Sequence, residues 1–200
     1  MKLLVTGFDP FGGERVNPSW MAAEALPDTV GTVQIVRRRL PVVFGACGEA
    51  VAAAMREERP DAVLCMGQAG GRAQVTPEFV GINWRSARIA DNAGNQPAGE
   101  RIVEAGPDAY FSTLPVAAMA QASVDVGLPA AVSYTAGTFC CNEVLYTALD
   151  TAVREMPGCR CCFVHVPYLP EQVATSGKVA PSMTLEAIVG SLTAMIEALG

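Results

Sequence analysis

Two adjacent cysteines, Cys140 and Cys141, lie in the segment AGTFCCNEVLY, where a polar loop meets a helical pattern. The N-terminus of a helix carries free N–H groups and a positive partial charge, which favour a thiolate and can stabilise an oxyanion. A cysteine nucleophile also needs a base, and the only histidine of the chain is His165, at the end of the strand-like segment CRCCFVHV. These residue types indicate acyl transfer through sulfur, with one of the two cysteines attacking and His165 moving the proton.

An acidic or amide side chain should orient the imidazole in such a site. Glu78, in TPEFVGINW, and Asp91, in IADN, are the two candidates. Each could instead be a solvated charge at the end of a strand, and a lone histidine is often purely structural. Spacing along the chain does not choose between the two acids.

The remaining cysteines and the glycine-rich loops match no cofactor motif. Cys47 and Cys65 lie in apolar patterns, as small buried hydrophobic residues do. Cys159, Cys161 and Cys162 contain a CxxC spacing, but it lies beside a strand and has no second pair of ligands, which disfavours both zinc and redox chemistry. The loop GQAGGR lacks the order GxGxxG, and no GxxxxGK[ST] is present. We therefore expect neither a metal nor a cofactor.

Short apolar runs alternate with helical patterns along the whole chain. The runs show little polar alternation, which is typical of strands buried on both faces of a parallel sheet; they are Leu3–Thr6, Val33–Val36, Ala62–Met66, Ala130–Tyr134 and Cys161–Val166. Helical spacing occurs between them, at Ser19–Ala25, Ala46–Arg56, Val116–Val126, Glu143–Arg154 and Ser182–Leu199, the last with Ser182 as its expected N-cap. Phe79–Trp84 and Arg88–Ala90 could form a further strand pair, before a long loop over residues 91–107.

This alternation predicts an α/β fold, an open sandwich in a single domain over residues 1–200. Ligand sites of such folds lie at the carboxyl ends of the strands. Three rich loops follow predicted strands, namely GFDPFGGERVNPS, GQAGGR and AGTF, and we expect the site there.

Composition limits the partners and the compartment. The net charge of −6 and a pI near 4.8 argue against nucleic acid or an anionic membrane surface as the main partner. No apolar stretch is long enough to span a bilayer, and the N-terminus does not resemble an export signal. Seven cysteines without such a signal favour reduced thiols in a cytoplasm.

Several long motifs together resemble the pyroglutamyl peptidase I family of cysteine peptidases, also called pyrrolidone-carboxylate peptidases. The resemblance runs nearly from end to end and is carried by TGFDPFGGERVNPS (Thr6–Ser19), LPVVF (Leu40–Phe44), CMGQAGGR (Cys65–Arg72), TPEFVGINW (Thr76–Trp84), ARIADNAGNQP (Ala87–Pro97), SYTAGTFCCNEVLY (Ser133–Tyr146) and FVHVPYLPEQ (Phe163–Gln172). It implies a cytoplasmic peptidase that removes an N-terminal pyroglutamyl residue from peptides without metal or cofactor. It also implies a homotetramer and an α/β/α sandwich with a mostly parallel, twisted central sheet.

The resemblance also implies roles for particular residues. The nucleophile of the family is the cysteine before the asparagine of GTF-x-CN, here Cys141, and the family motifs pair it with His165 and Glu78. The resemblance places Phe8, Phe11, Ile89, Phe139 and Cys140 as walls of the substrate pocket. We further expect Gln68 near its polar edge, and Arg88 to assist the helix N–H groups in stabilising the oxyanion.

Two positions depart from the family pattern. Phe79 replaces the arginine that usually follows the catalytic glutamate, and Cys140 replaces a valine of similar size. The first change puts the orientation of Glu78 or a subunit contact in question. Two other functions therefore remain open: a cysteine amidase for a different small lactam or amide, and a binder of pyroglutamyl peptides without turnover.

Overall fold

One central sheet contains the apolar runs that begin at Leu3, Val33, Ala62 and Cys161, and these four strands are parallel. The structure is a computed structural model that describes residues 1–176 and 179–200. The six strands of the sheet lie in the order β2-β3-β1-β4-β10-β5. They span Thr29–Val30 (β2), Val33–Leu40 (β3), Lys2–Phe8 (β1), Ala62–Gln68 (β4), Arg160–Val166 (β10) and Thr76–Glu78 (β5). Strands β3, β1, β4 and β10 are parallel, whereas β2 and β5 pair antiparallel at the two edges.

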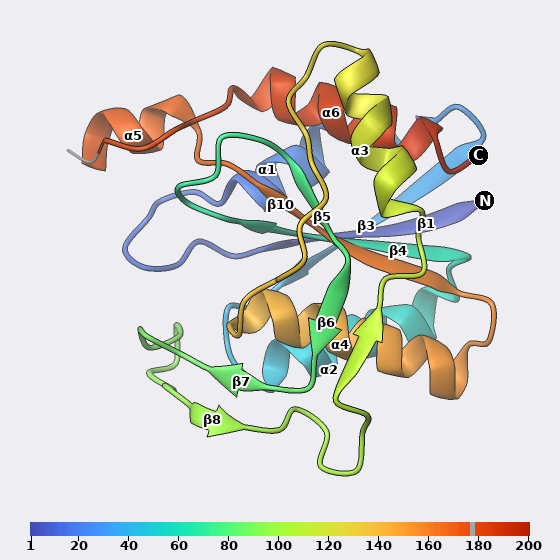
Figure 1. Cartoon of the computed structure of the whole chain (residues 1–200), viewed down its shortest axis with the longest axis vertical. Helices are drawn as coiled ribbons and strands as arrows, with labels where there is room; N and C mark the ends of the chain where they lie inside the picture. The colour runs from blue at the N-terminus through green and yellow to red at the C-terminus, as the bar shows by residue number, and fades with distance from the viewer. Residues whose placement is uncertain (177–178) are drawn as a thin grey trace.

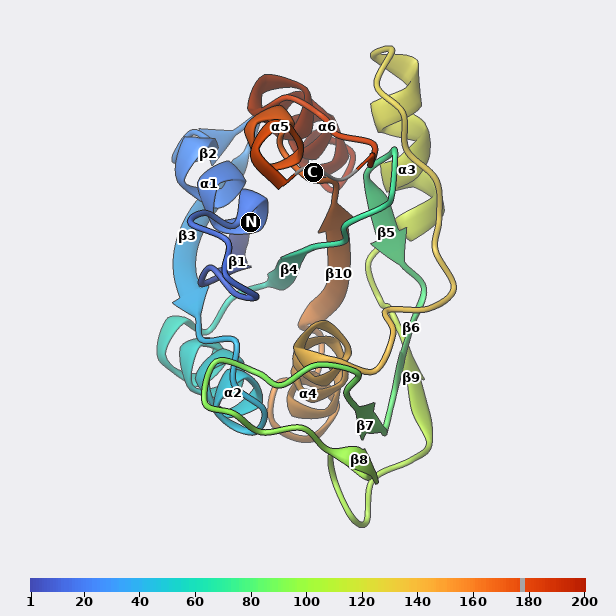
Figure 2. The same cartoon turned by 90° about the vertical axis from the view of Figure 1, so that its left-hand side faces the viewer.

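Helices cover both faces of this sheet (Figures 1 and 2). One layer contains α1 (Pro18–Ala25), α3 (Val116–Asp125) and α6 (Leu185–Glu197), and the other contains α2 (Ala46–Glu58) and α4 (Cys140–Glu155). Alternate strand residues enter opposite cores: Leu3 and Leu64 pack under the first layer, Leu4 and Val63 under the second. Both faces must therefore be apolar, which is why these strands lack polar alternation. The predicted α/β/α sandwich with a mostly parallel sheet is confirmed.

The predicted strand Ala130–Tyr134 is wrong. This segment runs parallel to β5 but makes only isolated bridges, Val75 to Ala130 and Glu78 to Ser133. A parallel row of hydrogen bonds joins Ala131 N to Val75 O, Ser133 N to Pro77 O and Phe79 N to Ser133 O, but Pro77 in the middle of β5 has no N–H to donate, so the ladder is interrupted there. The segment therefore lies along the edge of the sheet, bonded to β5 at intervals without forming a continuous strand.

The proposed pairing of Phe79–Trp84 with Arg88–Ala90 is also wrong. Only Val80–Ile82 (β6) is a strand, and it pairs antiparallel with Ala109–Phe111 (β9). Arg85–Ser86 (β7) pairs instead with Ala98–Glu100 (β8), inside the region expected to be a loop. Pairing between distant segments replaced the local hairpin that proximity in sequence suggested.

The helix boundaries differ from the prediction, most clearly at the start of α6. Helix α6 begins at Leu185, and its N-cap is Thr184, whose Oγ1 accepts a hydrogen bond from the Ala187 N–H at 3.2 Å. Ser182 is not the cap because it forms an extended bridge with Tyr168. A short helix, α5 (Pro170–Ser176), follows β10 and was not predicted. Among the described residues, no helix combines the length and apolarity needed to cross a membrane.

Candidate active site

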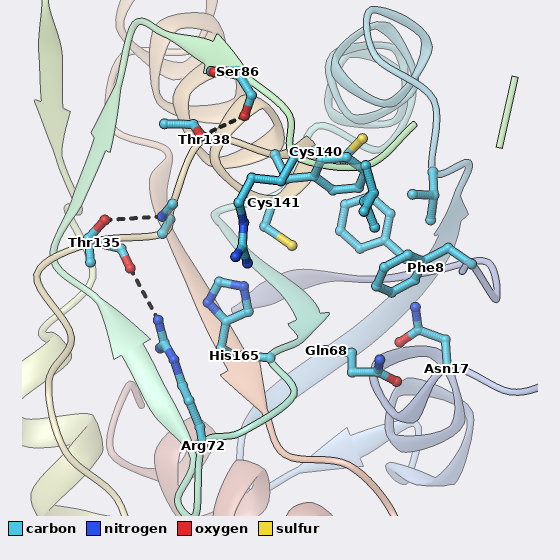
Figure 3. Close-up of a pocket in the computed structure, with 18 residues that line it drawn as sticks. Phe8, Asn17, Gln68, Arg72, Ser86, Thr135, Thr138, Cys140, Cys141 and His165 are labelled. Atoms are coloured by element: carbon cyan, nitrogen blue, oxygen red, sulfur yellow. Dashed lines mark hydrogen bonds between the residues drawn. The ribbon is translucent and has the colours of Figure 1, made fainter. Parts of the chain in front are cut away.

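A cavity of about 620 Å³ opens where the carboxyl ends of β1, β4 and β10 meet the start of α4 (Figure 3). Its lining contains every candidate site residue except the two acids, Glu78, which is hydrogen-bonded to His165, and Asp91. The lining residues are Phe8, Phe11, Asn17, Val42, Gln68, Ala69, Arg72, Ser86, Arg88, Ile89, Thr135, Ala136, Gly137, Thr138, Phe139, Cys140, Cys141 and His165.

The first turn of α4 presents its N–H groups to this cavity. Phe139 is the N-cap, with extended backbone, and within the described chain its side chain makes no capping hydrogen bond. The first intrahelical bond runs from Glu143 N to Phe139 O at 3.2 Å, so the preceding N–H groups of the turn are not used by the helix. Such N–H groups can bind an oxyanion.

Asn142 fixes the start of α4 against β6. Its Oδ1 accepts from the Ile82 N–H at 2.9 Å, and its Nδ2 donates to Ile82 O at 2.8 Å and Trp84 O at 2.9 Å. The side chain is 1% exposed. The asparagine after the cysteine pair therefore acts structurally, by holding the helix start in place.

The two cysteines have different surroundings. Cys140 is 1% exposed and packs in the core between the sheet and α2, with its carbonyl oxygen 4.0 Å from Cys47 Sγ. Cys141 is partly exposed, and its side chain extends toward the imidazole of His165 (Figure 3). Only Cys141 therefore combines access to the cavity with proximity to His165.

Sheet register brings Glu78 to His165. In the antiparallel pairing of β5 with β10, His165 is opposite Thr76, so Glu78 lies on the same face as its diagonal neighbour. The His165 Nδ1 to Glu78 Oε1 distance is 2.7 Å, and both side chains are buried. Asp91, the alternative, accepts hydrogen bonds from Phe44 N, Ala93 N and Asn95 N and shapes its own loop.

Burial is the largest influence on the pKa values of Cys141, His165 and Glu78. It lowers the pKa of His165 below its usual value, and the hydrogen bond and charge of Glu78 offset only part of that effect. Burial also raises the pKa of the Cys141 thiol, with further increases from Cys47 and Glu78. Burial alone would raise the pKa of Glu78, but His165 and Arg72 lower it overall. Near pH 7 these pKa shifts favour a carboxylate, a neutral imidazole and a neutral thiol, whereas the helix N-terminus by itself favours a thiolate.

Arg72 is a site residue that the sequence reasoning missed. Its Nη1 donates to Glu78 Oε1 at 2.6 Å and to Thr76 Oγ1, and its Nη2 donates to Thr135 O at 3.2 Å. The signal was its position in the loop GQAGGR directly after β4, where ligand sites form.

Phe79 points to a different environment from Glu78. Its ring packs against Phe111 at 5.0 Å and Tyr134 at 5.6 Å between centroids. Arg72 supplies the cation that contacts Glu78. Position 79, where the family usually has an arginine, does not supply it here.

The predicted pocket walls form a largely aromatic surface. The rings of Phe11 and Phe139 are 6.2 Å apart, and Phe44 packs edge-on against Phe139 at 4.9 Å. Phe8 is buried beneath the cavity, whereas Ile89 is half exposed at its rim. The cavity thus combines an aromatic wall with polar side chains from other parts of the lining.

Gln68 and Arg88 are two of the polar residues in the lining. Gln68 Oε1 accepts a hydrogen bond from Gln172 Nε2 at 2.9 Å, which orients the Gln68 amide. Arg88 lines the cavity that Cys141 also lines. Across the described parts of the chain, no group of three or more His, Cys, Asp or Glu side chains could hold a metal ion.

Gly67 leaves room for the Cys141 sulfur. A Cβ atom at position 67 would lie 2.8 Å from Cys141 Sγ and 2.7 Å from Phe163 Cζ, closer than side chains approach one another. We expect Gly67→Ala to displace the sulfur and lower kcat by about 10²-fold, since small misplacements have effects of that size. Steady-state kinetics would test this, with Gly190→Ala in α6 as the matched control that keeps wild-type kcat. A wild-type kcat for Gly67→Ala would contradict a reacting role for this sulfur.

Comparison with known proteins adds the family. The profile of one protein family, described as pyroglutamyl peptidase, matches residues 1–200. The chain belongs to the pyroglutamyl peptidase family. It is 51% identical over 198 residues to a pyrrolidone-carboxylate peptidase of Enterococcus faecalis, covering 99% of this chain and 92% of the relative. A relative of the same description from Levilactobacillus brevis is 49% identical over 199 residues, covering 100% and 97%.

Solved structures of the family share the fold. The crystal structure of Bacillus amyloliquefaciens pyroglutamyl peptidase I superposes with a TM-score of 0.95 at 47% identity, covering 99% of this chain and 96% of that one. Pyrrolidone carboxyl peptidase from the hyperthermophile Pyrococcus furiosus also has a TM-score of 0.95, at 38% identity, covering 100% and 98%. The family resemblance found in the sequence motifs is confirmed.

Proposed function

We propose that this protein is a cysteine peptidase that hydrolyses the amide bond after an N-terminal pyroglutamyl residue, through Cys141, His165 and Glu78. Membership of the pyroglutamyl peptidase family supports the substrate class. The observation that carries the assignment of residues is the 2.7 Å contact between His165 and Glu78, beside a cavity that Cys141 enters from the start of α4. This is the arrangement of nucleophile, base and orienting acid that acyl transfer requires.

The reaction begins with proton transfer. Glu78 holds His165 through Nδ1, which leaves Nε2 to take the thiol proton of Cys141 as the sulfur attacks the pyroglutamyl carbonyl. The first-turn N–H groups of α4, with Arg88, bind the resulting oxyanion. Collapse breaks the C–N bond, His165 protonates the leaving amine, and a thioester forms on Cys141. Water, deprotonated by His165, then hydrolyses the thioester and releases pyroglutamate.

The cavity lining accounts for the choice of a lactam. Pyroglutamate is a neutral ring without an amino-terminal charge, so apolar walls of Phe11, Phe139 and Ile89 can cover it. The Gln68 amide can hydrogen-bond a lactam N–H or C=O. Among the lining residues there are two arginines and no carboxylate, so the ammonium of an ordinary peptide N-terminus would lose its hydration beside like charges.

A panel of fluorogenic amides tests this function. We expect turnover of the pyroglutamyl amide and less than about 1% of that rate on prolyl, alanyl and glutamyl amides, because burying an unpaired charge costs several kcal/mol. Prior treatment with a thiol-alkylating reagent should stop the reaction. Efficient turnover of a different small amide would identify another kind of amidase. Binding of a pyroglutamyl peptide without turnover would identify a binder.

Assembly as a homotetramer and a cytoplasmic location remain predictions from the sequence resemblance. The exposed rings of Phe111 and Tyr134 beside Phe79 are compatible with a subunit contact. Sedimentation velocity would measure the particle mass against four chains of 20.9 kDa each.

A further inference from the structure

Arg72 joins strand β5 to the loop that precedes α4, which lies more than sixty residues beyond Arg72 along the chain. Its guanidinium contacts the Glu78 carboxylate at 2.6 Å, the Thr76 hydroxyl on the same strand, and the Thr135 carbonyl at 3.2 Å on the loop that leads to α4. The Arg72 side chain is 27% exposed, whereas Glu78 is fully buried. Figure 3 shows Arg72 extending beside His165 toward Thr135.

One carboxylate oxygen of Glu78 accepts two hydrogen bonds. Glu78 Oε1 accepts both from Arg72 Nη1 at 2.6 Å and from His165 Nδ1 at 2.7 Å. Arg72 and Glu78 therefore cancel each other's charge while the imidazole is neutral. If His165 took up a proton in the resting site, the buried group would carry a net positive charge. Without Arg72, the same protonation would neutralise the carboxylate instead.

We propose that Arg72 is a positioning residue of this site, which holds Glu78 against His165 and balances its charge so that the resting imidazole stays neutral and able to accept the thiol proton. This inference rests on the proposed function of His165 as the base. In this proposal Arg72, a loop residue outside the group of Cys141, His165 and Glu78, controls the protonation state of His165.

The other charged or titratable groups around the imidazole do not supply this balance. His165 lies against Glu78 on β5, Cys141 on α4 and Arg72, and Arg88 lines the same cavity. Glu78 acts to raise the pKa of His165, while Arg72 acts with burial to lower it. Arg72 also opposes the rise in the pKa of Cys141 that burial causes. Arg72 is thus the cation in direct contact with the carboxylate that would otherwise stabilise a protonated His165.

The single histidine of the chain makes a direct test possible. In protein labelled with ¹³C and ¹⁵N at histidine, every imidazole signal belongs to His165, so its titration can be followed by NMR without assignment. Arg72→Gln removes the charge and keeps a hydrogen-bond donor, whereas Arg72→Lys keeps the charge. Arg56→Met removes an exposed arginine that pairs with Glu155 outside the cavity, and controls for net charge.

We expect the pH midpoint of the His165 titration to move to higher pH in Arg72→Gln. The midpoint should stay near the wild-type value in Arg72→Lys and Arg56→Met. The loss of kcat/KM in Arg72→Gln should be larger at pH 6 than at pH 8, because each pKa unit changes the neutral fraction about tenfold below the midpoint. An unchanged or lower midpoint in folded Arg72→Gln would overturn the proposal.

A second comparison covers the case in which Arg72→Gln does not fold. Glu78→Gln should lower the His165 midpoint, and the double variant Arg72→Gln/Glu78→Gln should return it toward wild type. Equal midpoints for the single and double variants would also overturn the proposal. These titrations need no turnover, so wild-type protein that fails on pyroglutamyl amides would refute the proposed function while the role of Arg72 is still measured.

Discussion

Replacing Cys141 with alanine is expected to lower kcat/KM on a pyroglutamyl amide by at least about 10⁴-fold, because losing the nucleophile removes the covalent route. The matched change Cys140→Val is expected to retain kcat within a few-fold. Cys140 is 1% exposed and contributes only a wall, and valine has a similar size and polarity. Steady-state kinetics of the two variants, with circular dichroism to show that both fold, would measure the contrast. A dead Cys140→Val enzyme beside an active Cys141→Ala enzyme would reverse the assignment.

Alkylation followed by peptide mapping gives an independent check of the same residue. Cys159 is also partly exposed, and a hydrogen bond from Cys161 lowers the pKa of its thiol, so this cysteine should be labelled too. We therefore expect inactivation to follow labelling of Cys141 alone. Before alkylation, the Cys159→Ser variant should be as active as wild type. On alkylation it should be inactivated at the same rate as wild type. Inactivation that follows label on Cys159 or Cys140 would count against Cys141.

Replacing His165 with alanine should have a comparable effect, a loss of about 10⁴-fold in kcat/KM, because the chain offers no second histidine to move the proton. In wild-type protein, burial lowers the pKa of His165 below its usual 6.5. The base is then neutral above pH 6.5, and kcat/KM should fall only as the pH drops below that value. A pH–rate profile together with the variant's rate would measure both effects.

Two substitutions of Glu78, the partner of His165, should lower the rate to different extents. Glu78→Gln should keep part of the rate, since an amide can still orient the imidazole through Nδ1, whereas Glu78→Ala should lose more. Activity of His165→Ala within tenfold of wild type would remove the histidine from the mechanism. An acid limb centred above pH 6.5 would show that Glu78 outweighs burial in the resting site.

Local patterns in the sequence were sufficient for most of the fold. Four of the five predicted strands and all five predicted helices are present, because apolar runs and helical spacing depend on neighbours within a few residues. The exception, Ala130–Tyr134, has the composition of a strand but lies beside the three-residue β5. Whether an apolar segment completes a ladder depends on the N–H donors of its partner, here interrupted by Pro77, and the segment itself does not encode them.

The sequence by itself determined the reactive types and their motifs: a cysteine pair at a helix start, one histidine at a strand end, and two acids that could serve it. Spacing left both acids open and the family motifs favoured Glu78; the tertiary structure places Glu78 Oε1 2.7 Å from His165 Nδ1, across 87 residues, and holds Asp91 in its own loop. It also added Arg72, which no spacing rule connects with Glu78. The physical reason is that sheet register places side chains from distant strands on one face, while burial and the charges gathered there decide which of them carry protons.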